Sequence, residues 1–514
     1  MKPVSLLVFL AAGLSTVPGV SAASPLERLP RSTPEEQGIS AAAILRYVDA
    51  LETKVRSPHS FMLVRHGRVV AEGWWTPYAA AEPHALFSLS KSFTSTAVGL
   101  AISEGKLRVS DPVIGFFPEK APANPSPNLQ AMRVRDLLRM SSGQHGEDVD
   151  PFPFNTDQDL VRVFLAKPVA HRPGTHFFYN TAGTYMLSAI VQKVTGQTVR
   201  DYLGPRLFEP LGMADPRWDA SAQGITLGGY GLSLRTEDIA CFGQLYLQRG
   251  RWNGRQLVPA AWVDEATALQ TANGSDPDGN WDQGYGYQFW RCPHNCYRGD
   301  GAFGQLCVVM PEADAVLVVT AGTDELGPEF NLTWEHLLPA FAGAPLQPDP
   351  AANRRLRERL AGLSLPVQEG RASSPIAADV ARKQFTFADN ALGLETLALV
   401  PAKDRTGAMT VECKLAGIGQ RIVCGQGSWR KGVWPAPHTP PGLGDPAPIA
   451  ASGAWTADDT YTVKIVRYQT PFTLQLRLRF AGNQVAVDLD QELNFGERHP
   501  VHLVGEASAP TFSR

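Results

Sequence analysis

"FSLSKSFTSTAVGLAISEGKL", residues 87–107, places Ser88 and Lys91 three positions apart at the start of an apolar helix. The residues after Lys91 are mostly apolar, which predicts a buried helix that ends near Gly105. Side chains three residues apart share a helix face, so Lys91 can reach the Ser88 hydroxyl. Because burial lowers the pKa of a lysine, its neutral amine can take the serine proton. The alternative is that Ser88 merely caps the helix and Lys91 is solvated.

The spacing alone is a weak signal, because two other stretches of the chain repeat it. Ser103 and Lys106 lie at the polar end of the same helix, where a solvated face is expected, and "SWRK" at 428–431 lies in a turn between strands. The pair at Ser88 is the one that combines a helix start with a strongly apolar helix body. Ser88 and Lys91 are therefore the candidate nucleophile and base.

A second stretch, "RPGTHFFYNTAGTYMLSAIVQKVTG" at 172–196, contains a Pro-Gly turn, then Tyr179 and Asn180, then an apolar helix that Gly196 ends. Together with "FSLSKSF", with "LLRMSSG" at 137–143 and with "GGYGLSLRTEDIACFGQLYL" at 228–247, it resembles the serine β-lactamase and penicillin-binding-protein superfamily. The resemblance is closer to the class C β-lactamase-like branch, which includes family VIII carboxylesterases, D-stereospecific peptidases and 6-aminohexanoate-dimer hydrolases. It covers residues 35–341, approximately.

The resemblance implies an α+β, β-lactamase/transpeptidase-like fold, in which an antiparallel sheet is flanked by helices and accompanied by a helical subdomain. It also implies that Ser88 is acylated and that Lys91 is its hydrogen-bonded base or proton relay. Tyr179 would be a second base, as phenolate or through its hydroxyl, and would protonate the leaving group. Whether Lys91 or Tyr179 takes the first proton stays open. This chemistry needs no metal and no other cofactor.

The second motif of the family is usually Tyr-x-Asn, and the chain departs from it. Asn180 directly follows Tyr179, and Thr181 takes the usual place of the asparagine. Either Asn180 or Thr181 can bind a substrate carbonyl.

The third motif, usually Lys-Thr-Gly or His-x-Gly, also differs. In "YRGDGAFGQLCVVMP" at 297–311 the sequence "GDG" takes its place, so the basic residue is missing. Arg298 carries a charge, but it directly precedes Gly299 in the strand. Its side chain is therefore expected to point to the opposite face of the sheet from position 299. The backbone N–H groups near Gly301 and Ala302 would complete an oxyanion hole with that of Ser88.

Composition and charge are those of an ordinary globular protein. The 514 residues predict one large domain and a smaller one, and 44 % hydrophobic against 19 % charged residues allow a sizeable core. The formal net charge of -3 favours neither a nucleic-acid partner nor an anionic membrane. No later stretch has the ~18 apolar residues that a membrane span needs. The sequence carries no signal for an oligomeric state.

The first residues, "MKPVSLLVFLAAGLSTVPGVSAAS", contain Lys2, a short apolar run and small residues before position 22. They predict a secretory signal peptide over residues 1–22 and a periplasmic or secreted mature protein, because Pro18 and Gly19 disfavour a buried N-terminal helix. Residues 30–343 are predicted to form the hydrolase domain and residues 344–375 a linker with a short helix. Residues 376–514 are predicted to form a β-rich accessory domain.

Hydrophobic periodicity predicts the local elements of both domains. The predicted strands cover 61–71, as two strands around a His66-Gly67 turn, and 285–290, 306–310, 315–320, 461–467 and 472–480. The predicted helices cover 134–140, 181–194, a helix capped by Thr236, 331–341 and 353–363.

Export makes disulfides plausible. Cys292 and Cys296 are spaced for a tight loop, and Cys413 and Cys424 are spaced for a hairpin, so we predict two disulfides. The remaining Cys241 and Cys307 lie in apolar runs and are predicted to be buried thiols. His145 and His171 precede loops and are predicted to be surface residues.

The sequence thus predicts a secreted serine hydrolase that cleaves a small ester or amide bond through a Ser88 acyl-enzyme. A peptidase that acts on short or non-standard peptides is a close alternative. β-Lactamase activity is expected to be weak or absent, because the missing basic residue commonly recognises the β-lactam carboxylate. The rival class is a non-catalytic protein that binds peptides or peptidoglycan, and the presence of Ser88, Lys91 and Tyr179 together argues against it.

Overall fold

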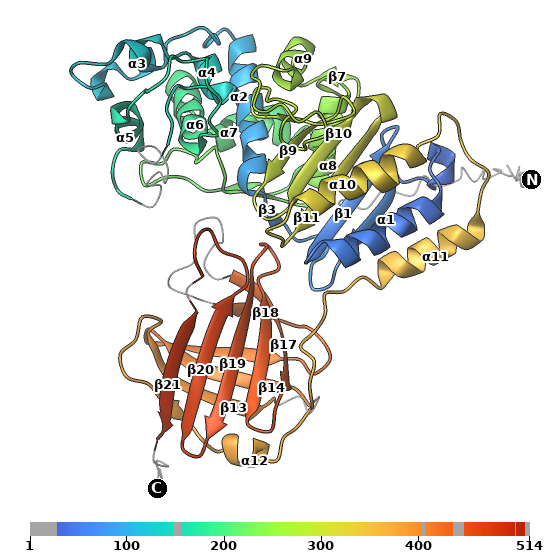
Figure 1. The fold of residues 1–514 in the computed structure, drawn as a ribbon, viewed down its shortest axis with the longest axis vertical. Helices are drawn as coiled ribbons and strands as arrows, with labels where there is room; N and C mark the ends of the chain where they lie inside the picture. Colours follow the sequence, from blue (N-terminus) through green and yellow to red (C-terminus); the bar gives the residue numbers. More distant parts are fainter. Residues whose placement is uncertain (1–27, 147–155, 403–406, 435–446, 499, 509–514) are drawn as a thin grey trace, which may run out of the picture.

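The computed structural model describes residues 28–146, 156–402, 407–434, 447–498 and 500–508, which form two domains (Figure 1). The N-terminal domain contains the Ser88 helix and a central sheet, and the C-terminal β-domain contains the strands that follow residue 376. The predicted signal peptide, residues 1–22, lies outside the described residues. Within the described part of the chain, no helix is both long enough and apolar enough to cross a membrane.

A six-stranded antiparallel sheet forms the centre of the N-terminal domain, in the order β2-β1-β11-β10-β9-β8. β1 and β2 form the predicted hairpin, and His66 and Gly67 both have positive φ (48° and 69°), as a tight two-residue turn requires. Every residue of β1 is buried, because helices cover both faces of the sheet. The strands are β1 Pro58–Arg65, β2 Arg68–Trp74, β8 Trp290–Arg291, β9 Tyr297–Gly301, β10 Gln305–Met310 and β11 Ala315–Ala321.

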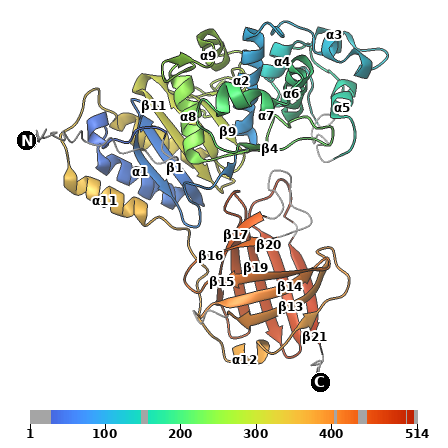
Figure 2. The ribbon, with the colours of Figure 1, turned by 180° about the vertical axis from the view of Figure 1, so that it is seen from behind.

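Two layers of helices enclose this sheet (Figures 1 and 2). On one face, α2 (Ser90–Ser103) and α8 (Thr236–Leu247) share one hydrophobic core with the sheet. On the other face lie α1 (Ala41–Lys54), α10 (Gly327–Leu332) and α11 (Pro350–Ala361), which share a second core. α2 is buried over its first three turns, which confirms the predicted burial of the helix after Ser88.

A helical subdomain lies beside α2 (Figure 1), and Thr181 of this subdomain contacts Lys91 of α2. Its longest helix, α6, begins directly after Asn180 and ends at Gly196, whose left-handed backbone (φ 73°) closes the helix. The helices here are α3 Pro127–Ala131, α4 Val134–Leu138, α5 Leu160–Ala166, α6 Thr181–Thr195, α7 Val199–Leu203 and, on the other side of α2, α9 Ala260–Thr267. The short strands are β3 His84–Ala85, β4 Arg217–Trp218, β5 Leu232–Leu234, β6 Arg251–Trp252 and β7 Arg255–Gln256.

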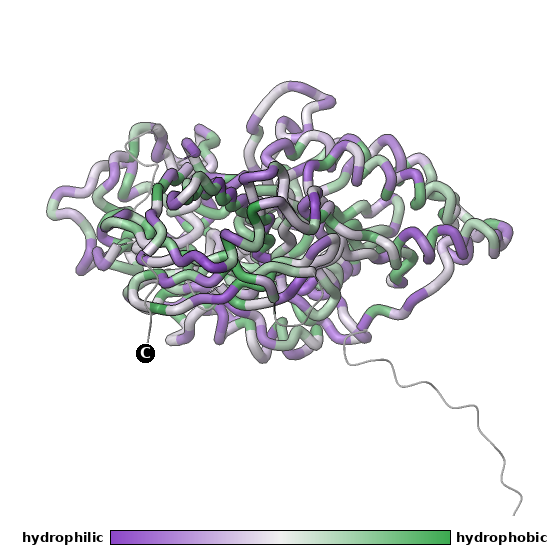
Figure 3. Tube along the Cα trace, turned by 90° about the horizontal axis from the view of Figure 1, so that it is seen from below, coloured by the Kyte–Doolittle hydropathy of each residue, from purple (hydrophilic) through white to green (hydrophobic). Residues whose placement is uncertain are grey.

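The C-terminal β-domain is a ten-stranded antiparallel sheet in the order β15-β14-β13-β12-β21-β20-β19-β18-β17-β16. Its strands alternate between buried apolar and more exposed polar residues, as in "TLQLRLRFA" of β19, where the leucines are buried. Figure 3 shows hydrophobic and hydrophilic residues interspersed along the chain. A bridge joins Gly425, directly after the end strand β15, to Ser452 in β17 near the other end of the sheet. The sheet therefore nearly closes into a barrel around its own core. The elements are α12 Ala377–Val380, β12 Phe385–Thr386, β13 Leu394–Pro401, β14 Met409–Leu415, β15 Ile418–Cys424, β16 Arg430–Trp434, β17 Ala447–Trp455, β18 Thr460–Val466, β19 Thr473–Ala481, β20 Gln484–Gln491 and β21 Val501–Ala507.

Three local predictions differ from the structure. The helix predicted at 331–341 starts earlier, as α10, and continues as a wide turn, Thr333–Leu337, and a 3-10 turn, Leu338–Ala340, because Pro339 lacks the N–H that an α-helix needs. Of the strand predicted at 285–290, only Trp290 lies in a named strand, β8. The N-cap of α8 is Arg235 rather than Thr236, and the Asp238 carboxylate accepts a hydrogen bond from the Arg235 N–H.

Neither predicted disulfide is present, because all six cysteines are free thiols. In the β14–β15 hairpin, Cys413 lies opposite Gln420 and Cys424 opposite Met409. Their thiols are therefore separated by about 13 Å along the strands, beyond the ~7 Å Cα separation that a disulfide bridges. In the other pair, Cys292 Sγ accepts a hydrogen bond from Arg298 at 3.1 Å and Cys296 Sγ lies 3.3 Å from the His294 carbonyl oxygen.

Candidate active site

The Ser88 hydroxyl and the Lys91 amine meet at the N-terminal end of α2. Ser88 lies in a 3-10 turn, Phe87–Leu89, and Phe87 has a left-handed backbone with φ of 47°. Lys91 Nζ lies 3.0 Å from Ser88 Oγ. Lys91 is only 1 % exposed, whereas Ser88 is half-buried. A substrate can therefore reach the hydroxyl, while the amine stays shielded from water.

The surroundings of Lys91 favour its neutral form. Its Nζ donates to the Gly229 carbonyl oxygen at 2.8 Å and contacts Thr181 Oγ1 at 3.2 Å. Burial lowers the pKa of Lys91 to about 7, although the Asp300 carboxylate opposes this effect. A neutral amine has two N–H donors and one lone pair, so it can donate to Gly229 and Thr181 and accept the proton of Ser88.

Tyr179 covers this pair and is held by aromatic neighbours. Its ring centre lies 4.9 Å from Lys91 Nζ, Trp290 stacks on it at 5.4 Å, and Tyr285 meets it edge-on at 6.2 Å. Burial and the nearby Asp300 carboxylate raise the pKa of Tyr179 well above its usual value, and a hydrogen bond with Ser88 opposes them only in part. Tyr179 therefore keeps its proton at neutral pH.

The structure separates the two candidates of the second motif. Thr181 faces the site, because its Oγ1 contacts Lys91 Nζ. Asn180 does not: its Oδ1 caps α6 by accepting from the Gly183 N–H at 3.1 Å, and its Nδ2 donates to Gln144 Oε1 at 2.9 Å. Both polar atoms of the buried Asn180 side chain thus have partners in the fold, which leaves Thr181 as the polar group beside the nucleophile.

Strand β9 runs directly beside the Ser88 turn. A Cβ atom at Gly301 would lie 2.0 Å from the Leu86 carbonyl oxygen and 3.0 Å from the Ser88 nitrogen, so only glycine allows this approach. Ala302 follows in the turn to β10 and packs in an apolar cluster with Phe303. The strand that carries the third motif is therefore close to the Ser88 backbone, as an oxyanion hole requires.

Arg298 does not replace the missing basic residue. It is fully buried, its Nε donates to Asp300 Oδ2 at 2.8 Å, and its Nη1 donates to the Asn280 carbonyl oxygen at 2.8 Å. The rings of Trp290 and Phe330 lie beside the guanidinium, at 5.6 Å and 4.2 Å. The orientation agrees with the strand alternation, since Arg298 and Asp300 pair on one face of β9.

The C-terminal β-domain touches the residue next to the nucleophile. Phe472, between β18 and β19, and Phe495, after β20, lie 6.1 Å and 5.7 Å from the Phe87 ring. Phe303 contacts Phe87 at 5.4 Å and Phe495 at 4.7 Å. We call Phe87, Phe303, Phe472 and Phe495 the phenylalanine cluster. Phe495 is 69 % exposed, so the cluster presents an apolar surface to solvent.

Two hydrogen bonds to backbone carbonyl groups fix the position of this domain edge. The Ala85 N–H donates to the Gln469 carbonyl oxygen at 2.9 Å, and the Tyr78 hydroxyl donates to the Thr470 carbonyl oxygen at 2.8 Å. The loop 467–472 is therefore docked just before the Ser88 turn. The sequence analysis missed Trp290, Phe472 and Phe495, because no motif or spacing links them to Ser88.

A half-buried serine that is hydrogen-bonded to a buried lysine and covered by a tyrosine defines a nucleophilic hydrolase site. The chain belongs to the Beta-lactamase family, whose sequence profile matches residues 46–342, more than half of its length. The matched region contains Ser88, Lys91 and Tyr179 and ends before the C-terminal β-domain. The chain is thus a serine hydrolase of the β-lactamase-like family, with a β-lactamase/transpeptidase-like fold.

The relatives of the chain include proteins named as a hydrolase and as an esterase. The chain is 25 % identical over 315 residues to the 6-aminohexanoate-dimer hydrolase of Paenarthrobacter ureafaciens. The aligned region covers 56 % of this chain and 79 % of that protein. It is 28 % identical over 114 residues to the lovastatin esterase of Penicillium rubens, covering 20 % of this chain and 28 % of that protein. A solved structure, the putative 6-aminohexanoate-dimer hydrolase from Bacillus anthracis, has 19 % identity and a TM-score of 0.49, covering 60 % of this chain and 86 % of that one.

Proposed function

We propose that Ser88 is the acylated nucleophile, that Lys91 is its base and that Tyr179 is a proton donor and relay. The single observation that carries this assignment is the 3.0 Å contact between the Lys91 amine and the Ser88 hydroxyl in a buried setting. A pKa of about 7 leaves Lys91 substantially unprotonated at neutral pH, whereas Tyr179 remains a phenol. Between the two candidates for the first base, these pKa directions favour Lys91.

The proposed reaction has two halves. Lys91 takes the proton of Ser88 as Ser88 Oγ attacks the carbonyl carbon, and the backbone N–H groups of Ser88 and Ala302 stabilise the oxyanion. As the tetrahedral intermediate collapses, the proton passes from Lys91 to the leaving group through the Tyr179 hydroxyl. A water molecule then attacks the carbonyl carbon of the acyl-enzyme and gives one proton through Tyr179 to Lys91. Lys91 passes this proton to Ser88 Oγ as the bond between the carbonyl carbon and Oγ breaks, which releases the acid and restores Ser88.

We propose a small carboxylic ester or a linear amide as the substrate. The names of the relatives include both an esterase and a hydrolase of 6-aminohexanoate dimers, which supports this range. The phenylalanine cluster beside Ser88 favours an apolar group on the substrate. Because the charge of Arg298 is held by Asp300 inside the fold, we expect β-lactam hydrolysis to be weak or absent.

Short or non-standard peptides are the second candidate substrate class, supported by the same acyl-transfer site. A binding protein without catalysis is disfavoured physically, because burying the Lys91 amine costs stability that peptide recognition does not require. We further propose export to the periplasm or the medium, from residues 1–22 alone. Sequencing the N-terminus of the mature protein tests this proposal.

Covalent labelling tests the function. The wild type, Ser88→Ala and Ser103→Ala are each treated with a fluorophosphonate and analysed by intact-mass spectrometry. Ser103→Ala is the matched control, because Ser103 also lies three residues before a lysine. We expect one adduct in the wild type and in Ser103→Ala, and none in Ser88→Ala. Turnover of short-chain p-nitrophenyl esters, linear amides, dipeptides and nitrocefin then ranks the substrate classes. An unlabelled wild type that turns over none of them would establish the binding protein instead.

A further inference from the structure

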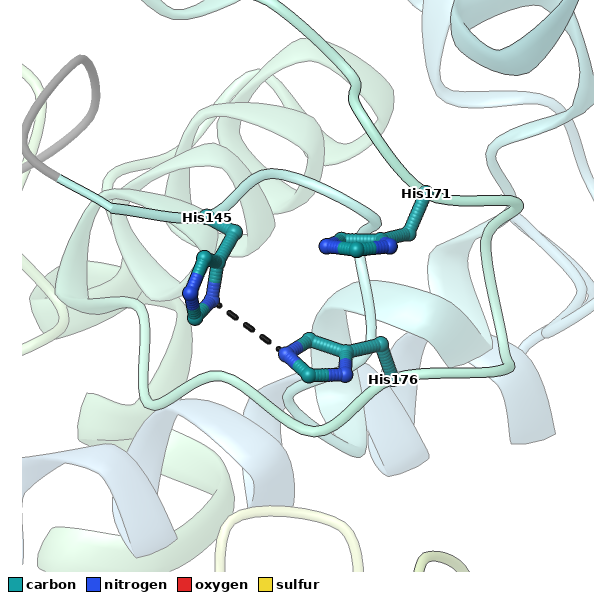
Figure 4. A group of neighbouring side chains, drawn as sticks. All are labelled: His145, His171 and His176. Carbon is teal, nitrogen blue, oxygen red and sulfur yellow. Dashed lines mark hydrogen bonds between the residues drawn. The ribbon is translucent and has the colours of Figure 1, made fainter.

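Three histidines gather beside the loop that leads to Tyr179 (Figure 4). His171 and His176 flank the Pro-Gly turn at 173–174, and His145 comes from the loop that follows α4. Each offers one ring nitrogen, and these nitrogens all lie within 4.8 Å of one another. Figure 4 shows the three rings directed toward a common space, with His145 Nδ1 and His176 Nε2 only 3.3 Å apart.

The backbone holds the two loops together before any ligand binds. The His171 N–H donates to the Gly143 carbonyl oxygen at 2.9 Å, and the Gly174 N–H donates to the Ser141 carbonyl oxygen at 2.7 Å. Gly143 has φ of 84°, and a Cβ atom there would lie 2.2 Å from the His171 carbonyl oxygen. The loop that carries His145 therefore lies in direct contact with the loop that carries His171, so the histidines start near their final positions.

The three rings pack against one another. His171 stacks on His176 at 4.4 Å, and His145 meets His176 edge-on at 4.8 Å. Neutral imidazole is the form of histidine that ligates metal ions.

We propose that His145, His171 and His176 form a binding site for a divalent transition-metal ion of the zinc class. Zn–N bonds of about 2.0–2.1 Å in tetrahedral geometry place ligand nitrogens roughly 3.4 Å apart, close to the observed separation of the His145 and His176 nitrogens. The His171 nitrogen lies within 4.8 Å of the other two, so its ring has to move closer when the ion binds. Imidazole nitrogen suits zinc, copper and nickel, while magnesium and calcium prefer oxygen ligands.

The ion ties two loops of the helical subdomain together at the approach to the active site. His176 lies three residues before Tyr179, and Phe178 between them packs on the His145 ring at 4.8 Å. The site is at the surface, since His145 is exposed, so water fills the position that three protein ligands leave open. Binding is independent of the acyl-enzyme chemistry and stabilises the loop that positions Tyr179.

Zinc titration of the untagged, chelator-treated full chain tests the proposal. Calorimetry of the wild type should give one saturable equivalent of zinc. Cobalt(II) in place of zinc should give the intense visible absorption of a tetrahedral site. His145→Gln, His171→Gln and His176→Gln should each weaken zinc binding by about tenfold or more.

His66→Gln is the matched control, because His66 is an exposed histidine that contacts Gln37 elsewhere on the N-terminal domain. Its zinc affinity should stay at the wild-type value. Thermal unfolding without metal checks that each variant folds. Added zinc should raise the unfolding midpoint of the wild type and of His66→Gln, and should raise that of the His145, His171 and His176 variants less. A wild type that binds no zinc, or a triple histidine variant that binds it as tightly as the wild type, overturns the proposal.

Discussion

The two sides of the Ser88 site are built in different ways. On the proton-transfer side, Lys91 comes from α2, Tyr179 from the loop before α6 and Thr181 from the start of α6, all within the N-terminal domain. On the apolar side, Phe87 meets Phe472 and Phe495, which belong to the C-terminal β-domain.

The proposed function assigns proton transfer to the first side and substrate contact to the second. In that reaction, removing a buried polar group from the first side should abolish a step that no neighbour can supply. Removing one ring from the second side should take away only part of a shared apolar surface, so the remaining rings could still contact the substrate. The two sides should therefore give losses of very different size.

Lys91→Met should cause the largest loss. Methionine has nearly the same shape but no lone-pair nitrogen, so we expect kcat/KM for ester hydrolysis to fall by about 10⁴-fold. Lys106→Met, which changes an exposed lysine of the same spacing motif, should leave the rate unchanged. Steady-state kinetics on a p-nitrophenyl ester measures kcat/KM for the wild type and both variants. A Lys91→Met enzyme that keeps a tenth of the wild-type activity would remove Lys91 from the role of base.

Tyr179→Phe should have a smaller effect, about 10² to 10³-fold in kcat/KM. The phenyl ring keeps the stacking on Trp290, so the variant isolates the hydroxyl. The loss should be greater for amides than for p-nitrophenyl esters, because an amine leaving group needs a proton and a nitrophenolate does not. Equal losses on both substrates would argue for a structural role of the hydroxyl.

The pH dependence of kcat/KM reports the same amine. Lys91 must be neutral to act, and its pKa is about 7. Activity should therefore rise with pH through about 7 and fall about tenfold per pH unit below it. Tyr179→Phe should keep this acidic limb, since the limb belongs to Lys91. An acidic limb near pH 4 to 5 would instead point to a carboxylate as the base.

Stability links to the same pKa. In the unfolded chain a lysine has a pKa near ~10.4, so between pH ~7 and ~10.4 the unfolded state binds one more proton than the folded state. The free energy of unfolding of the wild type, relative to Lys91→Met, should rise by about 1.4 kcal/mol per pH unit in that window. Urea unfolding at several pH values measures this slope. A flat difference would mean that Lys91 is charged in the folded protein.

The proton-transfer side was predictable because its residues lie in local patterns. Ser88 and Lys91 are three positions apart at the start of a helix, and Tyr179 and Thr181 flank the start of another. Short-range geometry therefore sets the direction of their side chains. The sequence also predicted the buried helix and several strands of both domains, since these follow hydrophobic periodicity. It did not decide between Asn180 and Thr181, because the choice depends on Gln144, which holds Asn180 away from Ser88.

The apolar side was not predictable, because its contacts join residues about four hundred positions apart in sequence. Nothing around Phe472 or Phe495 marks them, since isolated phenylalanines are common in any β-rich domain. The failed disulfide prediction has a similar origin. Cys413 and Cys424 are close in sequence, but the register of their hairpin sets them apart.

Phe495→Ala should give the smallest effect and tests the apolar side alone. The ring is 69 % exposed, so its removal should change stability little. We expect kcat/KM for esters with long or aromatic acyl groups to fall by roughly threefold to tenfold, and acetyl esters to be unaffected, because only the larger groups reach the ring. Val504→Ala, which truncates an exposed apolar side chain on β21 of the same domain, is the matched control. If Phe495→Ala slows acetyl and larger acyl esters by the same factor, the phenylalanine cluster positions the Ser88 turn rather than contacting substrate. The two sides of the site would then differ in the domain that supplies their residues, but both would serve the reaction at Ser88 rather than one of them binding the acyl group.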